Sequence, residues 1–250
     1  MSVRTLKTLL IVSVLLNIGA VYVSIKGWEY RSHINHFLEK YTHVVQEFSA
    51  RGVHLEANKA LRSDTTIPGR VVFMGTQVTE GWPLGESFPG LEPINRGVIG
   101  QRLAGFPLRF YSDVVNLRPE AVVVEISSFQ FRPQYSTEEI AEWVAMMIDL
   151  AETHGIVPII PTIIPPRQGT TLEEAGDYRI SDTVTAFNSW LRAELARRDL
   201  PVCDFAERMT DSSGGLMVDL STTAVDINDR GYAAMARELR RVLTEHRIEN

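Results

Sequence analysis

Short apolar runs alternate with longer amphipathic stretches in the region from residue 67 to residue 250. The runs are short for helices and carry few polar residues, as is typical of strands that are buried on both faces. They lie at Val71–Met74, Pro93–Gly97, Ala121–Ile126, Val157–Ile160 and Pro201–Asp204. Helical spacing occurs between and after them, at Gln101–Leu117, Thr137–His154, Ser181–Arg198 and Asp229–Arg247. The alternation predicts a three-layer α/β/α fold, in which helices cover a parallel sheet of roughly five strands.

The amino-terminal residues 1–26 have a different pattern. Arg4 and Lys7 precede an apolar run from Thr8 to Ile25, in which Asn17 is the one strongly polar residue. The run is long for the core of a cleaved signal peptide and near the lower limit for a membrane-spanning helix, so we favour an uncleaved signal anchor. Because positive charge is concentrated before the run, the remainder of the chain is predicted to be exported. The sequence therefore predicts a single-pass protein of the cytoplasmic (inner) membrane with an extracytoplasmic carboxyl-terminal domain.

Residues 27–66 are expected to form a helical stalk and a linker. Apolar residues recur in them at alternating spacings of four and three, at Tyr30, Ile34, Phe37, Tyr41, Val44 and Phe48. Such a stripe, which we call the stalk seam, is typical of a helix that buries one face. The simpler interpretation is packing on the chain's own domain. The alternative is a homodimer through residues 30–48.

Composition excludes several classes of protein. The chain has 250 residues, is 44% hydrophobic and 22% charged, and carries a formal net charge of -6. The negative charge argues against a nucleic-acid partner, which requires clustered Lys and Arg. The single cysteine, Cys203, rules out an intrachain disulfide and any metal site built from several cysteines. We predict no metal site and no cofactor.

Several sequence motifs between residues 70 and 245 resemble those of a known family. They are Val-Val-Phe-Met-Gly-Thr-Gln-Val-Thr-Glu-Gly-Trp at 71–82, Pro-Ile-Asn-Arg-Gly-Val-Ile-Gly at 93–100, Leu-Arg-Pro-Glu-Ala-Val-Val-Val-Glu at 117–125 and Asn-Asp-Arg-Gly-Tyr-Ala-Ala-Met at 228–235. Together they resemble the SGNH (GDSL-type) hydrolases, near the branch of lysophospholipase L1 and platelet-activating-factor acetylhydrolase. The resemblance implies an SGNH-hydrolase-like, flavodoxin-like domain over residues 67–250.

The resemblance also implies where catalytic residues would lie, and this chain has other residues there. Gln77 replaces the nucleophilic serine, and its amide is no nucleophile at neutral pH. Gly100 matches a glycine whose backbone N–H contributes to the oxyanion hole, but Phe129 replaces the oxyanion asparagine. Thr223 and Asp226 replace the aspartate and histidine of Asp-x-x-His. We predict that these family positions are degenerate and that no catalytic residue remains.

A cleft without catalysis can still bind a ligand. The predicted lining consists of polar side chains around one acid, with an aromatic platform: Thr76, Gln77, Gly100, Ser127, Ser128, Phe129, Gln130, Thr223 and Asp226. Such a lining suits a polar ligand such as a glycan, or an envelope protein partner, although a filled and inert cleft fits the same residues. The alternative is an SGNH-like ester hydrolase or acyltransferase that uses Thr76 or Ser127 with Asp226 as its base.

Overall fold

The computed structural model describes residues 3–131, 135–169 and 180–248, with the side chains of residues 39–40 and 42–48 excepted. Two compact units divide the chain, Met1–Glu47 and Phe48–Asn250. The first consists of all but the last two residues of helix α1 (Val3–Ser49), whose apolar portion Val3–Leu38 is long enough to cross a membrane. The helix ends where Ala50 adopts a left-handed backbone conformation with φ of 49°. Val44 and Phe48 of the predicted stalk seam have side chains outside the described part.

A parallel sheet forms the centre of the second unit. Its strands are β1 (Arg70–Gly75), β2 (Glu92–Gly97), β3 (Ala121–Val124) and β4 (Val157–Ile159), in the order β2-β1-β3-β4. Among the described residues the sheet has four strands, and the prediction of a fifth strand at Pro201–Asp204 is wrong. Pro201–Asp204 forms no ladder; its Cys203 O accepts a hydrogen bond of 2.9 Å from Thr162 N, in the segment that follows β4.

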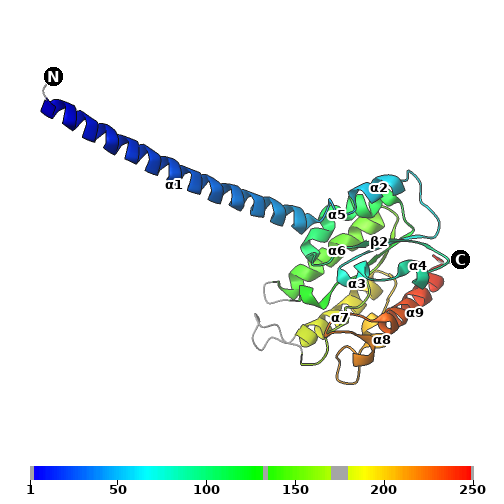
Figure 1. The fold of residues 1–250 in the computed structure, drawn as a ribbon. Coiled ribbons are helices and arrows are strands. Elements are labelled where there is room, and N and C mark those ends of the chain that lie inside the picture. The colour runs from blue at the N-terminus through cyan, green and yellow to red at the C-terminus, as the bar shows by residue number, and fades with distance from the viewer. Residues whose placement is uncertain (1–2, 132–134, 170–179, 249–250) are drawn as a thin grey trace. The chain divides into compact units, whose positions relative to one another are not determined.

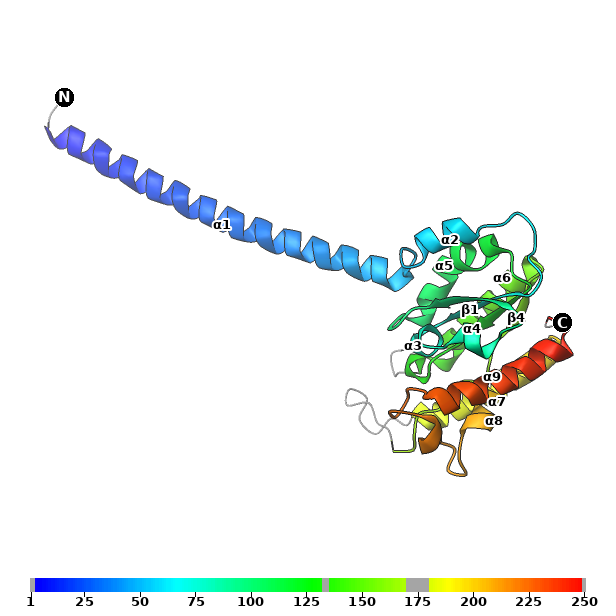
Figure 2. The same ribbon diagram turned by 45° about the vertical axis from the view of Figure 1, so that its right-hand side comes forward.

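Helices cover both faces of this sheet, as Figures 1 and 2 show for α5 and α6 on one side and α9 on the other. Successive strand residues point to opposite faces, so alternate β1 residues belong to different cores. Val72 packs in a core with α5 (Phe106–Asp113), α6 (Thr137–Thr153) and α7 (Ile180–Arg197). Phe73 packs in the other with α4 (Leu84–Ser87), α8 (Phe205–Met209) and α9 (Asp229–Glu245). The predicted three-layer α/β fold is confirmed.

Helix boundaries differ from the expected ones where local chemistry intervenes. The expected helix Gln101–Leu117 is divided into a 3₁₀ turn, α5 and a second 3₁₀ turn at Val115–Leu117. Pro107 lies in the first turn of α5, where its missing N–H costs no hydrogen bond. Helix α6 begins with a capping box, in which Ser136 and Glu139 exchange side-chain-to-backbone hydrogen bonds.

The segment that precedes the sheet belongs to the α/β unit. Helix α2 (Leu55–Leu61) buries Asn58, whose Nδ2 donates to Asp113 Oδ1 at 2.6 Å. The compact unit begins at Phe48, whereas the sequence pattern predicts one stalk and linker segment over residues 27–66. The hydrogen bonds of Asn58 to Asp113 and Arg96 are among the contacts that tie this helix to the α/β unit.

Candidate functional site

The carboxyl ends of β1 and β3 are joined by a buried carboxylate, Glu125. Its Oε2 accepts hydrogen bonds from Thr76 N at 2.8 Å, Thr76 Oγ1 at 3.0 Å and Thr79 Oγ1 at 3.1 Å. Burial raises the pKa of Glu125, and these hydrogen bonds oppose the rise only in part. The Thr76 hydroxyl therefore faces the interior of the protein, and only 1% of Thr76 is exposed.

Gln77 directly follows this junction. It is the first residue of α3 (Gln77–Glu80), and its carbonyl oxygen accepts a hydrogen bond from Gly81 N at 3.0 Å. The residue is partly buried. Strand β1 thus runs through Thr76 straight into a helical turn, which puts the Gln77 amide at the position where the family nucleophile is expected.

The chain after β3 forms a tight turn whose polar groups are used internally. Ser127 caps the 3₁₀ turn η3 (Ser128–Gln130) by accepting a hydrogen bond from Phe129 N at 3.3 Å. Gln130 Oε1 accepts a hydrogen bond from Leu103 N at 2.9 Å, and its Nε2 donates to Gln101 O at 3.1 Å. Gln130 is buried and holds the loop before α5, while Phe129 is partly buried.

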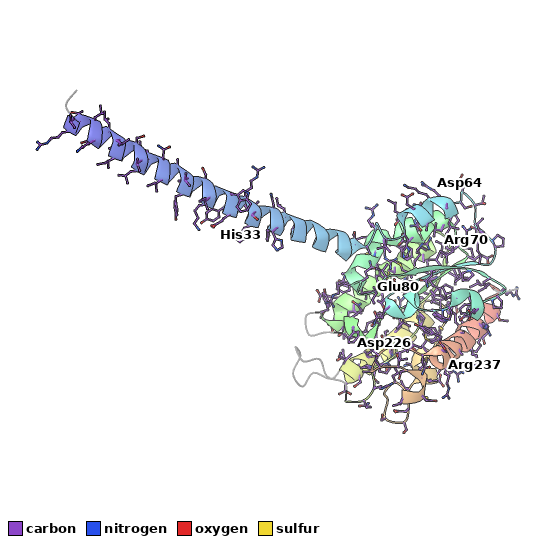
Figure 3. The ribbon with its side chains drawn as sticks, in the orientation of Figure 1. His33, Asp64, Arg70, Glu80, Asp226 and Arg237 are labelled. Atoms are coloured by element: carbon purple, nitrogen blue, oxygen red, sulfur yellow. The ribbon has the colours of Figure 1, made fainter. Side chains whose placement is uncertain are left out.

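Thr223 and Asp226 contact each other in the loop that leads to α9; Figure 3 marks Asp226. Thr223 Oγ1 donates to Asp226 Oδ2 at 2.7 Å and accepts from Asp226 N at 3.1 Å. The turn therefore brings residues three apart into hydrogen-bond contact, and three is the spacing of the Asp-x-x-His motif that these two positions match. Gly100, by contrast, is exposed and has a φ of 74°, and, apart from its two chain neighbours, no heavy atom lies within 4 Å of the position that a Cβ would take.

A small cavity lies between these strand ends. It has a volume of about 20 Å³, enough for about one water molecule. Of the predicted ligand-binding residues it brings together Ser127 and Ser128, and Glu125 lies beside them in its wall. The other lining residues are Val78, Ile126, Pro161, Thr162, Ile164, Phe205, Val225 and Ile227. Thr76, Gln77, Gly100, Phe129, Gln130, Thr223 and Asp226 are not among the described residues that line it.

Two residues near the site escape the sequence analysis as functional candidates. Glu125 is assigned to the sheet, because no local pattern shows that its side chain binds Thr76. Tyr232 of α9 donates its hydroxyl to Val78 O at 3.0 Å and stacks on Trp82, with ring centroids 5.9 Å apart. Burial and the neighbouring carboxylates Glu125, Asp226 and Asp229 raise the pKa of Tyr232 to about 12. The sequence could reveal the contact between Tyr232 and Val78 only if it also showed that α9 packs against α3.

The histidines of the α/β unit lie in other places. His54 precedes α2, where its Nε2 lies 3.2 Å from Gly97 O. His154 follows α6 and contacts Tyr111 Oη at 2.8 Å, and His246 follows α9. Within residues 3–131, 135–169 and 180–248, no group of three or more His, Cys, Asp or Glu side chains has a geometry that could hold a metal ion.

A buried polar network supports the site from the side of β2. Arg109 is fully buried, and its guanidinium donates to Asp113 Oδ2 at 2.8 Å, Gln101 Oε1 at 2.7 Å and Arg96 O at 2.8 Å. Burial lowers the pKa of Arg109, while Asp113 opposes that shift. Because the partners come from β2, α5 and the loop between them, the network fixes the end of β2 against α5.

Comparison with known proteins relates the α/β unit to lipase/acylhydrolase domains. The model of the GDSL-like lipase/acylhydrolase family matches residues 69–234. A GDSL-like lipase from Bacteroides thetaiotaomicron is 24% identical, with a TM-score of 0.71 over 80% of this chain and 99% of that one. A structure described as a platelet activating factor from Streptococcus pneumonia is 15% identical, with a TM-score of 0.67 over 85% and 99% of the two chains. These likenesses show the fold.

A curated relative matches a smaller part of this chain than these structures do. The uncharacterized lipoprotein YqeF of Bacillus subtilis (strain 168) is 23% identical over 147 residues. The match takes in 52% of this chain and 60% of that protein, so the chain matches less than two thirds of its relative's length. Together with the family match, the comparisons confirm the resemblance that the sequence motifs indicate.

Proposed function

We propose, from the premise that this chain belongs to the GDSL-like lipase/acylhydrolase family, that its α/β unit acts by binding and not by ester hydrolysis. In this proposal the domain is a catalytically degenerate member of the family, held at a membrane by α1 and serving as a binding or scaffold component of the cell envelope. One observation carries the proposal. The residue at the nucleophile position is the amide Gln77, at the end of β1 and the start of α3.

The hydroxyl groups nearby support the same conclusion. Thr76 Oγ1 donates to the buried Glu125 and is closed to solvent, so an ester carbonyl does not reach it. Asp226, at the position of the family base, accepts a hydrogen bond from Thr223. Loss of the nucleophile or the base from a catalytic triad typically reduces turnover by about 10⁶. The proposed loss of both leaves too little turnover for an esterase.

The alternative function is hydrolysis or acyl transfer by Thr76 or Ser127 with Asp226 as base. It requires a proton path from one of those hydroxyls to Asp226. In the described part of the chain, Thr76 Oγ1 donates to Glu125, and Ser127 Oγ accepts from the backbone N–H of Phe129. An exchange of Asp226 for Asn tests this alternative, because it removes the base and retains the shape.

Helix α1 and the YqeF match support a position in the envelope. Val3–Leu38 is long and apolar enough to span a bilayer, which requires about 20 residues. In this proposal α1 is the membrane attachment, and the domain lies on the extracytoplasmic side because Arg4 and Lys7 precede the apolar run.

The cavity size limits the kind of ligand. A space of about 20 Å³ accepts one water or one hydroxyl group, and not a sugar ring. A glycan or a peptide strand would therefore lie outside this space, on Gln77, Phe129 and Asp226, which are partly exposed and directly adjoin lining residues in the sequence. Recognition there would rest on amide, carboxylate and aromatic contacts, which suit sugar hydroxyls.

The test combines hydrolysis with binding. Full-length protein in detergent is assayed with p-nitrophenyl acetate and butyrate, and is screened against acetylated and unacetylated envelope glycans. We expect no turnover that depends on Asp226, and glycan binding that weakens in Gln77→Ala. Turnover in the wild type that is lost in Asp226→Asn would refute the binding function and support hydrolysis or acyl transfer with Asp226 as base.

A further inference from the structure

Helix α1 carries one heptad frame along most of its length. Counted back from the stalk seam, the a and d positions are Leu6, Leu9, Ser13, Leu16, Ala20, Val23, Gly27, Tyr30, Ile34, Phe37 and Tyr41. All of these side chains belong to the described part of the helix. The helix has 47 residues, about twice what a bilayer requires, so its carboxyl-terminal half extends beyond the hydrocarbon.

Apolar side chains in that second half are exposed, because their own helix does not bury them. Tyr30 is 68% exposed, Ile34 57%, Phe37 67% and Tyr41 60%. The Phe37 and Tyr41 rings stack with centroids 6.3 Å apart, which joins them into one continuous apolar surface. A helix that presents such a stripe to water is stabilised when a second surface covers it.

The first half of the helix has a different character in the same frame. Its a positions after Leu6 are the small residues Ser13, Ala20 and Gly27, while its d positions are Leu and Val. In lipid the hydrophobic effect does not drive helices together, and small residues favour contact because they let two backbones approach closely. Because the small positions and the stalk seam share one 3.5-residue period, a left-handed supercoil brings both onto the same side of the helix.

We infer that α1 is the interface of a parallel homodimer, in which the frame from Leu6 to Tyr41 of one copy packs against the same frame of a second copy. This inference rests on the membrane attachment proposed above. Two copies anchored in one membrane have the same direction and depth, so each seam residue meets its counterpart. The charged residues Lys26 and Glu29 are compatible with this arrangement, because they pair with each other within one helix, with Nζ and Oε2 2.7 Å apart.

Disulfide cross-linking of full-length protein in membranes tests the inference. The native Cys203 is buried, so an introduced cysteine is the reactive one. Ile34→Cys and Phe37→Cys lie in the seam, and Ser32→Cys lies on the opposite face and is the matched control. With copper phenanthroline as oxidant, we expect about tenfold more disulfide-linked dimer from each seam variant than from the control, because only seam positions meet the distance that a disulfide requires. Equal yields, or no dimer from the seam variants, would overturn the inference.

A second pair of variants tests whether the membrane half takes part. In the Ile34→Cys background, Ala20→Leu is expected to lower the dimer yield because it separates the helices, while the neighbouring Val21→Leu is expected to leave it unchanged. An unchanged yield in Ala20→Leu would refute the shared frame.

Carbonate extraction separates this inference from the proposed membrane attachment. Ile34→Cys that stays in the membrane pellet without cross-linking overturns the dimer alone. The same protein in the soluble fraction overturns both the dimer and the attachment.

Discussion

Glu125 offers the sharpest test of how the ends of β1 and β3 are held together. The perturbation is Glu125→Gln, which keeps the shape and removes the charge. Its amide oxygen can accept from Thr76 N and Thr79 Oγ1, and its amide nitrogen can donate to Thr76 Oγ1, the contact that now measures 3.2 Å. All three partners stay satisfied, so we expect a change in the free energy of unfolding of about 1 kcal/mol or less at pH 5.

Glu125→Ala has a different expected result. It leaves the Thr76 N–H and two threonine hydroxyls without their acceptor, and each such buried group costs about 1–3 kcal/mol. Some of the hydroxyls can turn to other partners, so we expect a total loss of about 3–5 kcal/mol. The contrast between the two variants isolates the hydrogen bonds from the charge.

The pH dependence gives the sign of the charge effect. Burial raises the pKa of Glu125 above its ordinary value of 4.5, so the folded protein binds this proton more tightly than the unfolded chain does. The stability from Glu125 is therefore complete below pH 4.5 and is lost as pH rises through the folded-state pKa. The slope is at most about 1.4 kcal/mol per pH unit. Glu125→Gln lacks this loss and gains on the wild type as pH rises.

Urea unfolding of residues 48–250 between pH 4.5 and pH 8 measures these differences. The exposed Glu86→Gln serves as the control and is expected to run parallel to the wild type. Parallel curves for Glu125→Gln and the wild type, or a loss above about 3 kcal/mol in Glu125→Gln at pH 5, would refute this account of the junction.

Three further predictions concern the surroundings of the site. Burial lowers the pKa of His54, so its contribution to stability is present above pH 6.5 and is lost as pH falls below it; His54→Gln should flatten that acid limb in urea unfolding. Gly97→Ala places a Cβ 2.2 Å from a backbone nitrogen of α3, so we expect a loss of about 1–3 kcal/mol in the same assay, and an unchanged midpoint would contradict the close approach of α3 to β2. The combined variant Gln77→Ser, Thr223→Asp and Asp226→His should gain ester turnover, because positions 223 and 226 are already in hydrogen-bond contact. That turnover should vanish when Gln77→Ser is omitted. A correctly folded variant without turnover would show that the family positions do not converge.

The sequence predicts the sheet better than it predicts the site. The apolar runs of β1 and β3 are long enough and apolar enough to identify buried strands, and the family motifs follow them directly. Pro201–Asp204 contains fewer apolar residues, with a proline at one end and an aspartate at the other, and it does not pair in a ladder, because strand pairing depends on a neighbour's backbone and not on the run itself.

Side-chain partners are the part that local patterns do not contain. Thr76 and Gln130 are polar residues in the segments that follow β1 and β3, a pattern that predicts a ligand site, but their hydrogen bonds lead to Glu125 and to the loop before α5. Glu125 is distant from Thr76 in sequence, and only the parallel register of β1 and β3 brings the two together. Thr223 and Asp226 are the exception, since a contact between residues three apart is a local one.

Labelling with a fluorophosphonate probe tests the central claim most directly, because this reagent modifies an activated hydroxyl regardless of the natural substrate. Full-length protein is treated with the probe and examined by intact mass and peptide mapping, with the combined Thr76→Val and Ser127→Ala variant as the control. The account predicts an unmodified protein, because the nucleophile position is occupied by an amide and Thr76 Oγ1 is closed off by Glu125. A single adduct on Thr76, Ser127 or Ser128 that is formed by the native fold and lost on unfolding would contradict it.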